Sequence, residues 1–157
     1  MFFYAAVLAF LGFSIPLVII DLREKRLPDR ILLIAYPAVT GLLVLAAWQD
    51  NNWDNLWRAL LAGLVVFAGY FMLRFINPSG LGAGDVKLSG LIGLILGWTS
   101  WQAALMGTAI GFVLGALVAA FLLLSKRRGL KQSLAFGPYM IAGAWLVLVP
   151  ALLVSWG

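Results

Sequence analysis

The acidic side chains are the groups in this sequence with the clearest capacity for chemistry. The chain contains no His and no Cys, which excludes His-dependent triads, Cys nucleophiles, disulfides and metal sites built on imidazole or thiolate. Catalysis would have to use carboxylates, Lys, Ser or the backbone. The six acids are Asp21, Glu24, Asp29, Asp50, Asp54 and Asp85. Asp50 and Asp54 stand among Asn and Gln residues, which is typical of a solvated loop.

Asp21 and Asp85 stand at the boundaries of long apolar segments. Asp21 directly follows the uncharged run 2–20, and Asp85 ends the motif Gly82-Ala83-Gly84-Asp85 before another apolar run. A carboxylate at a membrane face is costly and is therefore a candidate functional group. Each residue also has a structural interpretation: Asp21 would balance nearby basic residues, and Asp85 would be a helix N-cap. A phosphate-binding glycine loop is disfavoured, because the acid would repel phosphate.

Two carboxylates that approach each other can share one proton. The ionised one then acts as a base toward water and the protonated one as an acid toward a carbonyl oxygen, as in aspartic proteases. We assign Asp85 as the base and Asp21 as the acid. Such a pair hydrolyses peptides without help, so we expect no metal and no cofactor.

The rest of the sequence predicts the helices that must position these acids. Hydrophobic residues make up 64% of the 157 residues and charged residues 11%, whereas soluble domains have about 45–50% and about 25%. We therefore expect an all-α polytopic membrane protein with one domain, 1–157. The six expected spans are 2–20, 31–48, 59–76, 88–98, 103–124 and 134–156. The first helix can continue to about Arg26, because Pro28 disfavours helix at Leu27.

The fourth expected span, 88–98, is short: about 16 Å of helix against a hydrocarbon core of about 30 Å. The start of this helix, near Asp85, should therefore lie below the membrane surface. The polar cluster at 99–102, flanked by Trp98 and Trp101, predicts a tight connection to the fifth span.

The distribution of basic residues predicts the orientation. They gather in the first, third and fifth loops or beside them: Arg23, Lys25, Arg26, Arg30, Arg74, Lys87, Lys126, Arg127, Arg128 and Lys131. These loops should be cytoplasmic, with both termini on the other side. Asp21 and Asp85 then share the cytoplasmic face. The enrichment of Lys and Arg in cytoplasmic loops accounts for the net charge of +5. We therefore expect the protein to contact membrane lipid and not to bind nucleic acid.

These residues together resemble the type IV prepilin peptidases. The resemblance rests on Asp21, Leu27-Pro28-Asp29, Gly82-Ala83-Gly84-Asp85-Val86-Lys87-Leu88 and Phe136-Gly137-Pro138, in order along the chain. It implies an aspartic endopeptidase of a prokaryotic cytoplasmic membrane that cuts the short basic leader of prepilins, with Asp21 and Asp85 as catalytic residues. Larger members also carry a Cys-x-x-Cys region and methylate the new N-terminus. This chain resembles the short, peptidase-only form.

Several further residues are expected to bind substrate or support the site. Glu24 is a candidate to meet a basic leader, and Asp29 is expected to cap the second span. Gly137 and Pro138 are expected to loosen or kink the sixth span near the site. Lys87 could anchor its helix, contact a substrate carboxylate or tune the acid pair. The full set is Gly82, Gly84, Lys87, Glu24, Pro28, Asp29, Gly137 and Pro138.

Two alternative functions come from other classes of protein. A small transporter or channel could use Asp21, Asp85 and Lys87 along a cation path, but the fifth and sixth expected spans hold no ionisable group. A non-catalytic scaffold of a pilus or secretion machine would use both aspartates as caps. The sequence indicates no oligomeric state.

Overall fold

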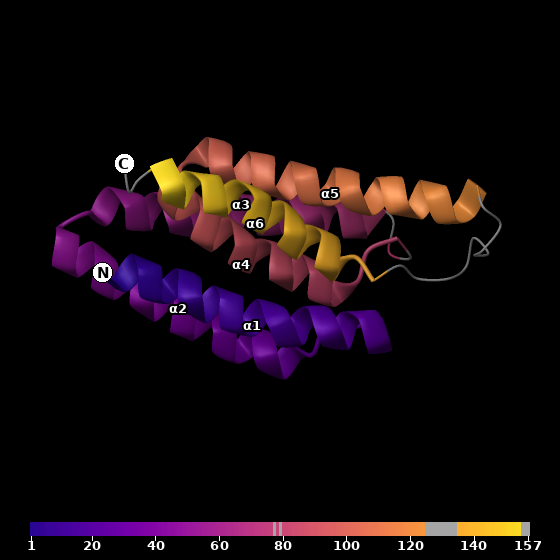
Figure 1. Cartoon of the computed structure of the whole chain (residues 1–157), viewed down its shortest axis with the longest axis horizontal. Coiled ribbons are helices and arrows are strands. Elements are labelled where there is room, and N and C mark those ends of the chain that lie inside the picture. Colours follow the sequence, from indigo (N-terminus) through magenta and orange to yellow (C-terminus); the bar gives the residue numbers. More distant parts are fainter. Residues whose placement is uncertain (77, 79, 125–134, 155–157) are drawn as a thin grey trace.

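The computed structural model describes residues 1–76, 78, 80–124 and 135–154. These residues form six helices and no strand, which confirms the all-α prediction. The helices are α1 (Phe2–Glu24), α2 (Asp29–Asp50), α3 (Trp53–Ile76), α4 (Ala83–Thr99), α5 (Trp101–Leu124) and α6 (Gly137–Val154). They lie side by side along one direction (Figure 1).

Four helices are long and apolar enough to cross a membrane. They are α1, α2, α3 and the part of α5 from Trp101 to Leu122. Most residues of these four are not buried within the protein, as expected for helices whose outer faces meet lipid. The protein is thus a multipass membrane protein with at least four candidate spans among the described residues.

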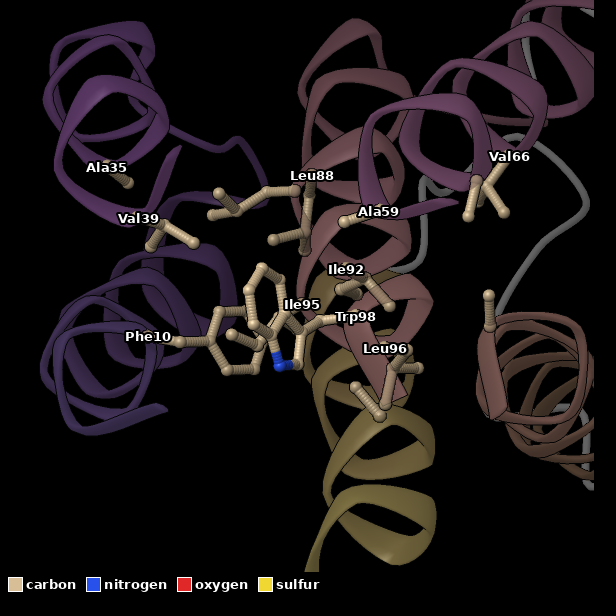
Figure 2. Packing of buried hydrophobic residues seen from close by; sticks show 14 of the residues in the cluster. Phe10, Ala35, Val39, Ala59, Val66, Leu88, Ile92, Ile95, Leu96 and Trp98 are labelled. Carbon is tan, nitrogen blue, oxygen red and sulfur yellow. The ribbon is translucent and has the colours of Figure 1, made fainter. Parts of the chain in front are cut away.

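The shorter helix α4 forms the centre of the bundle. Every residue from Leu88 to Trp98 is buried. Figure 2 shows Phe10 of α1 and Val39 of α2 pointing toward α4 from one side. On another side α3 approaches closely, because a Cβ added to Gly93 would lie 2.8 Å from the Cα of Gly63. This central position makes α4 a rigid support for the residues at its first turn.

Helix boundaries agree with several sequence predictions and correct others. The chain leaves α1 at Lys25, whose left-handed conformation ends the helix close to the predicted Arg26. Only Ser100 separates α4 from α5, which confirms the tight connection. The fourth helix is longer than the predicted span 88–98: it begins at Ala83, close to Asp85, and has 17 residues, about 26 Å. The predicted fifth loop and both ends of the predicted sixth span lie outside the described residues.

Arg58 of α3 holds the C-terminal end of α4. Its Nε donates to the carbonyl of Gly97 at 2.8 Å, and its Nη2 donates to the carbonyls of Trp98 and Thr99. The last carbonyls of a helix lack partners within the helix and carry its negative end. The guanidinium gives these carbonyls hydrogen-bond donors and places a positive charge at the negative end of the helix. It thereby fixes the end of α4 farthest from Asp85.

Replacing Arg58 with Met should destabilise the protein. The variant keeps an unbranched side chain but leaves three carbonyls without their charged donor, a loss of about 2 kcal/mol. The apparent melting temperature in detergent measures it. The control is Arg23→Met, since Arg23 is exposed. Equal melting temperatures for the two variants would contradict the role of Arg58.

Candidate active site

Asp21 is a buried carboxyl in the last turn of α1. The N–H of Gly137, the first residue of α6, donates to its Oδ2 at 2.9 Å. A side chain at position 137 would displace this carboxyl, because an added Cβ would lie 2.7 Å from the same oxygen. The end of α1 and the start of α6, 116 residues apart in the chain, therefore meet at this carboxyl.

Asp85 is a second buried carboxyl, in the first turn of α4. The N–H of Gly82 donates to its Oδ2 at 3.0 Å. Gly82 is the N-cap residue of the helix and Asp85 stands three positions later. The N-cap interpretation of Asp85 is therefore wrong, although its side chain does satisfy a free N–H at the helix start. A side chain at Gly82 would collide with this carboxyl, its Cβ lying 2.8 Å from Oδ2.

The two carboxyls line the same pocket, which has a volume of about 530 Å³. Asp85 interacts electrostatically with Asp21 and with the guanidinium of Arg74. The lining comes from the end of α1, the connection to α2 and the start of α4: Asp21, Glu24, Lys25, Arg26, Leu27, Pro28, Asp29, Arg30, Gly82, Ala83, Gly84 and Asp85. Figure 1 shows the end of α1 and the starts of α4 and α6 at one end of the bundle.

Leu27 is an apolar residue in the lining of the pocket. It is buried, whereas Lys25 and Arg26 of the same connection are exposed. A Cβ added to Gly84 would lie 2.6 Å from the Cβ of Leu27, and one added to Gly137 would lie 3.4 Å from its Cδ2. Leu27 thus packs against the starts of both α4 and α6. Sequence analysis names it only as part of the Leu27-Pro28-Asp29 motif and assigns it no role in the site.

Arg74 is another residue that sequence analysis does not assign to the site. Its Nη1 donates to the carbonyl of Leu81, directly before Gly82. The guanidinium therefore braces the segment that leads into the Gly82–Asp85 turn and brings positive charge near Asp85.

The remaining predicted site residues divide into two groups. Glu24, Pro28, Asp29, Gly82 and Gly84 line the pocket, whereas Lys87, Gly137 and Pro138 do not. Glu24 pairs with Arg26 at 3.2 Å, both side chains being largely exposed. Among the described residues, no group of three or more acids could hold a metal ion.

Two local predictions are corrected. Asp29 does not cap α2: Pro28 is the N-cap residue and Asp29 is the first helical residue. Its Oδ1 instead pairs with the Nζ of Lys87 at 2.7 Å. Gly137 and Pro138 do not interrupt a helix but form the first turn of α6, where proline has no N–H bond to lose.

Comparison with known proteins shows that the chain matches one family over most of its length. The model of the type IV leader peptidase family matches residues 8–124, which include both Asp21 and Asp85. The chain belongs to the type IV leader peptidase family. The resemblance noted from the sequence is therefore confirmed, and the chain is a member of a protease family.

The relatives differ in length. The leader peptidase HopD of Escherichia coli is 34% identical over 85% of each chain. The prepilin leader peptidase/N-methyltransferase of Pseudomonas putida is 31% identical over 83% of this chain and 44% of its own length. The Bacillus subtilis protein of the same name is 29% identical over 87% of this chain and 52% of its own. The chain thus spans about half the length of such relatives. No solved structure matches it.

Substituting Gly84 with Ala should disturb its packing against Leu27 in the lining of the pocket. The new methyl group would overlap Leu27, and overpacking of this kind costs about 1–3 kcal/mol. We expect a lower apparent melting temperature than for Gly41→Ala, whose added Cβ meets nothing within 4 Å. A Gly84→Ala variant as stable as the Gly41→Ala control would show that this contact is loose.

Proposed function

We propose that this protein is a membrane aspartic endopeptidase that cleaves the leader peptide of type IV prepilin-like proteins with Asp21 and Asp85. One observation carries the proposal: two buried carboxyls, from α1 and α4, line a single pocket. Family membership supplies the reaction class. The proposal treats 1–157 as one peptidase domain.

The reaction needs one ionised and one protonated carboxyl. The ionised carboxylate removes a proton from water, whose oxygen bonds to the scissile carbonyl carbon. The protonated carboxyl gives its proton to the carbonyl oxygen. When the tetrahedral intermediate collapses, the C–N bond breaks and the leaving nitrogen takes the proton that the first carboxylate removed from water. The second carboxylate takes a proton from a hydroxyl of the intermediate, which restores the starting state of the pair. The products are the leader with a new carboxyl group and the mature protein with a new amine.

We propose Asp85 as the base and Asp21 as the acid, although burial disfavours the ionised form of both carboxyls. Asp85 lies at the positive N-terminal end of α4 and near Arg74, which favour negative charge there. Asp21 lies at the negative C-terminal end of α1, although it also accepts the Gly137 N–H. In both cases the described donor contacts Oδ2, which leaves Oδ1 for water or substrate.

The substrate class follows from the relatives. Several of them are named prepilin leader peptidases. We propose that the apolar helix of the prepilin lies beside the spans while its basic leader meets the pocket, where Glu24 can contact a cationic side chain. HopD, which matches the chain over most of both lengths, is named a leader peptidase alone. We therefore propose cleavage without N-methylation.

The proposed placement is the cytoplasmic membrane of a prokaryote, with the pocket on the cytoplasmic side. All six helices would cross the membrane and both termini would lie outside. The first turn of α6 and the end of α1 lie at the same end of the bundle (Figure 1), where basic residues are dense in the sequence. A channel is not favoured, because the buried charged residues among those described are Asp21 and Asp85, both at this end.

The function is tested by incubating the protein in liposomes with a model prepilin and analysing the products by mass spectrometry. Wild type should release the leader and leave an unmodified N-terminus. Asp21→Asn and Asp85→Asn should each lower the rate by at least about a thousandfold, because an amide keeps the hydrogen bond but cannot share the proton. Asp50→Asn, at an exposed position, should cleave normally. Substantial cleavage by either active-site variant would contradict the proposal.

The orientation is tested by labelling single cysteines, which the cysteine-free chain allows. A membrane-impermeant maleimide should label Asp50→Cys in intact cells but label Arg23→Cys only after permeabilisation. Both positions are exposed and lie near opposite ends of the α1–α2 hairpin. The reverse labelling pattern would place the pocket on the other side of the membrane.

A further inference from the structure

The two catalytic carboxyls lie on parts of the protein that meet over a narrow contact. Asp21 belongs to the hairpin of α1 and α2, whereas Asp85 belongs to α4, which packs far more extensively against α3 than against α1 or α2. Figure 1 shows the hairpin along one side of the other helices. The hairpin also touches α6 and α3, so the contacts between α2 and α4 are one of a few sets that fix where the two carboxyls stand relative to each other.

Two polar contacts join α2 to the first turns of α4. The Asp29–Lys87 ion pair, with a distance of 2.7 Å, joins the first residue of α2 to α4. The Tyr36 hydroxyl donates to the carbonyl of Lys87 at 2.6 Å. Gly90 makes room for this hydroxyl, because an added Cβ there would collide with it. Both contacts thus converge on Lys87, two residues after Asp85.

We propose that Asp29, Tyr36 and Lys87 are positioning residues that hold α2 against the start of α4 and so set the approach of Asp85 to Asp21. This inference rests on the proposed peptidase function. Asp29 also lines the pocket, which places one member of the ion pair beside the reacting groups. None of the three residues needs to touch the substrate.

The environment of Lys87 supports a role in positioning α4 against α2 rather than a role in anchoring α4 to lipid headgroups. Its ammonium lies near the N-terminal ends of both α2 and α4, where helix dipoles disfavour a cation. Asp29 compensates for this charge. Because the pair is partly exposed, it contributes little to stability, and its loss should affect geometry more than folding.

Charge reversal tests the ion pair. Asp29→Lys and Lys87→Asp each bring like charges together and should lower kcat by at least about tenfold. For Lys87→Asp, at a residue outside the pocket lining, KM for the prepilin should change by less than about twofold. The double variant Asp29→Lys/Lys87→Asp restores an attractive pair and should regain most of the lost kcat. Asp54→Lys, at an exposed position near the other end of the bundle, is the control. Raised KM without rescue would overturn the proposal and assign Lys87 to substrate contact.

Steric compensation tests the tyrosine contact. Gly90→Ala should push the Tyr36 hydroxyl away from the Lys87 carbonyl and lower kcat. In a Tyr36→Phe background the oxygen is absent, so the same added methyl group should lower kcat by a much smaller factor. An equal effect of Gly90→Ala in both backgrounds would overturn the role of the hydroxyl.

A distance measurement separates failure of this inference from failure of the proposed function. Spin labels are attached at Leu22→Cys in α1 and Phe75→Cys in α3, which are exposed positions. Because α3 packs closely against α4, the distance between the labels follows the position of α1 relative to α4. Pulsed EPR should give a narrow distribution of label-to-label distances in the protein that carries only the two labels. The distribution should broaden or shift when Lys87→Asp is added, and should become narrow again in the double variant Asp29→Lys/Lys87→Asp. An unchanged distribution after Lys87→Asp would overturn the inference even if prepilin is cleaved. The expected shift without prepilin cleavage would instead contradict only the proposed function.

Discussion

The site depends on two backbone N–H groups that each hold a buried carboxyl. Burying a carboxyl without a hydrogen-bond donor is costly. Here the N–H of Gly137 donates to Asp21 and the N–H of Gly82 donates to Asp85. Both donors stand where a helix begins, at its positive end. The Gly137–Asp21 bond explains why the end of α1 and the start of α6 meet although they are far apart in the chain. The start of α4 joins them because Leu27, which follows α1, packs against Gly84 as well as Gly137. A pocket with two carboxyls is the consequence.

The glycines of the Gly82–Asp85 motif have separate physical roles. Gly82 gives its N–H to Asp85 and leaves room for the carboxyl, whereas Gly84 leaves room for Leu27. The first glycine therefore orients the acid, and the second lets the α1–α2 connection come close enough to complete the pocket. Arg74 adds a brace on the segment before the motif. A short motif that is weak as a sequence signal thus specifies a dense set of contacts.

The sequence predicts much of this structure, because hydropathy and charge determine where helices and loops lie. The pairing of Asp21 with Asp85 in one region also follows from loop charges. Hydropathy does not predict the first turns of α4, because Asp85 and Lys87 are charged residues within the helix. The Asp29–Lys87 pair and the packing of Leu27 could not be predicted, because they are tertiary contacts between segments whose relative placement no local pattern encodes.

The central claim is that Asp21 and Asp85 together hold the tetrahedral intermediate of peptide hydrolysis. The most direct test is the binding of a prepilin peptide whose scissile bond is replaced by a hydroxyethylene group, measured by calorimetry in detergent. A transition-state mimic should bind wild type at least about a hundredfold more tightly than the unreactive parent peptide. Asp21→Asn and Asp85→Asn should each lose that advantage while keeping affinity for the parent peptide. An advantage that persists in either variant would contradict the account.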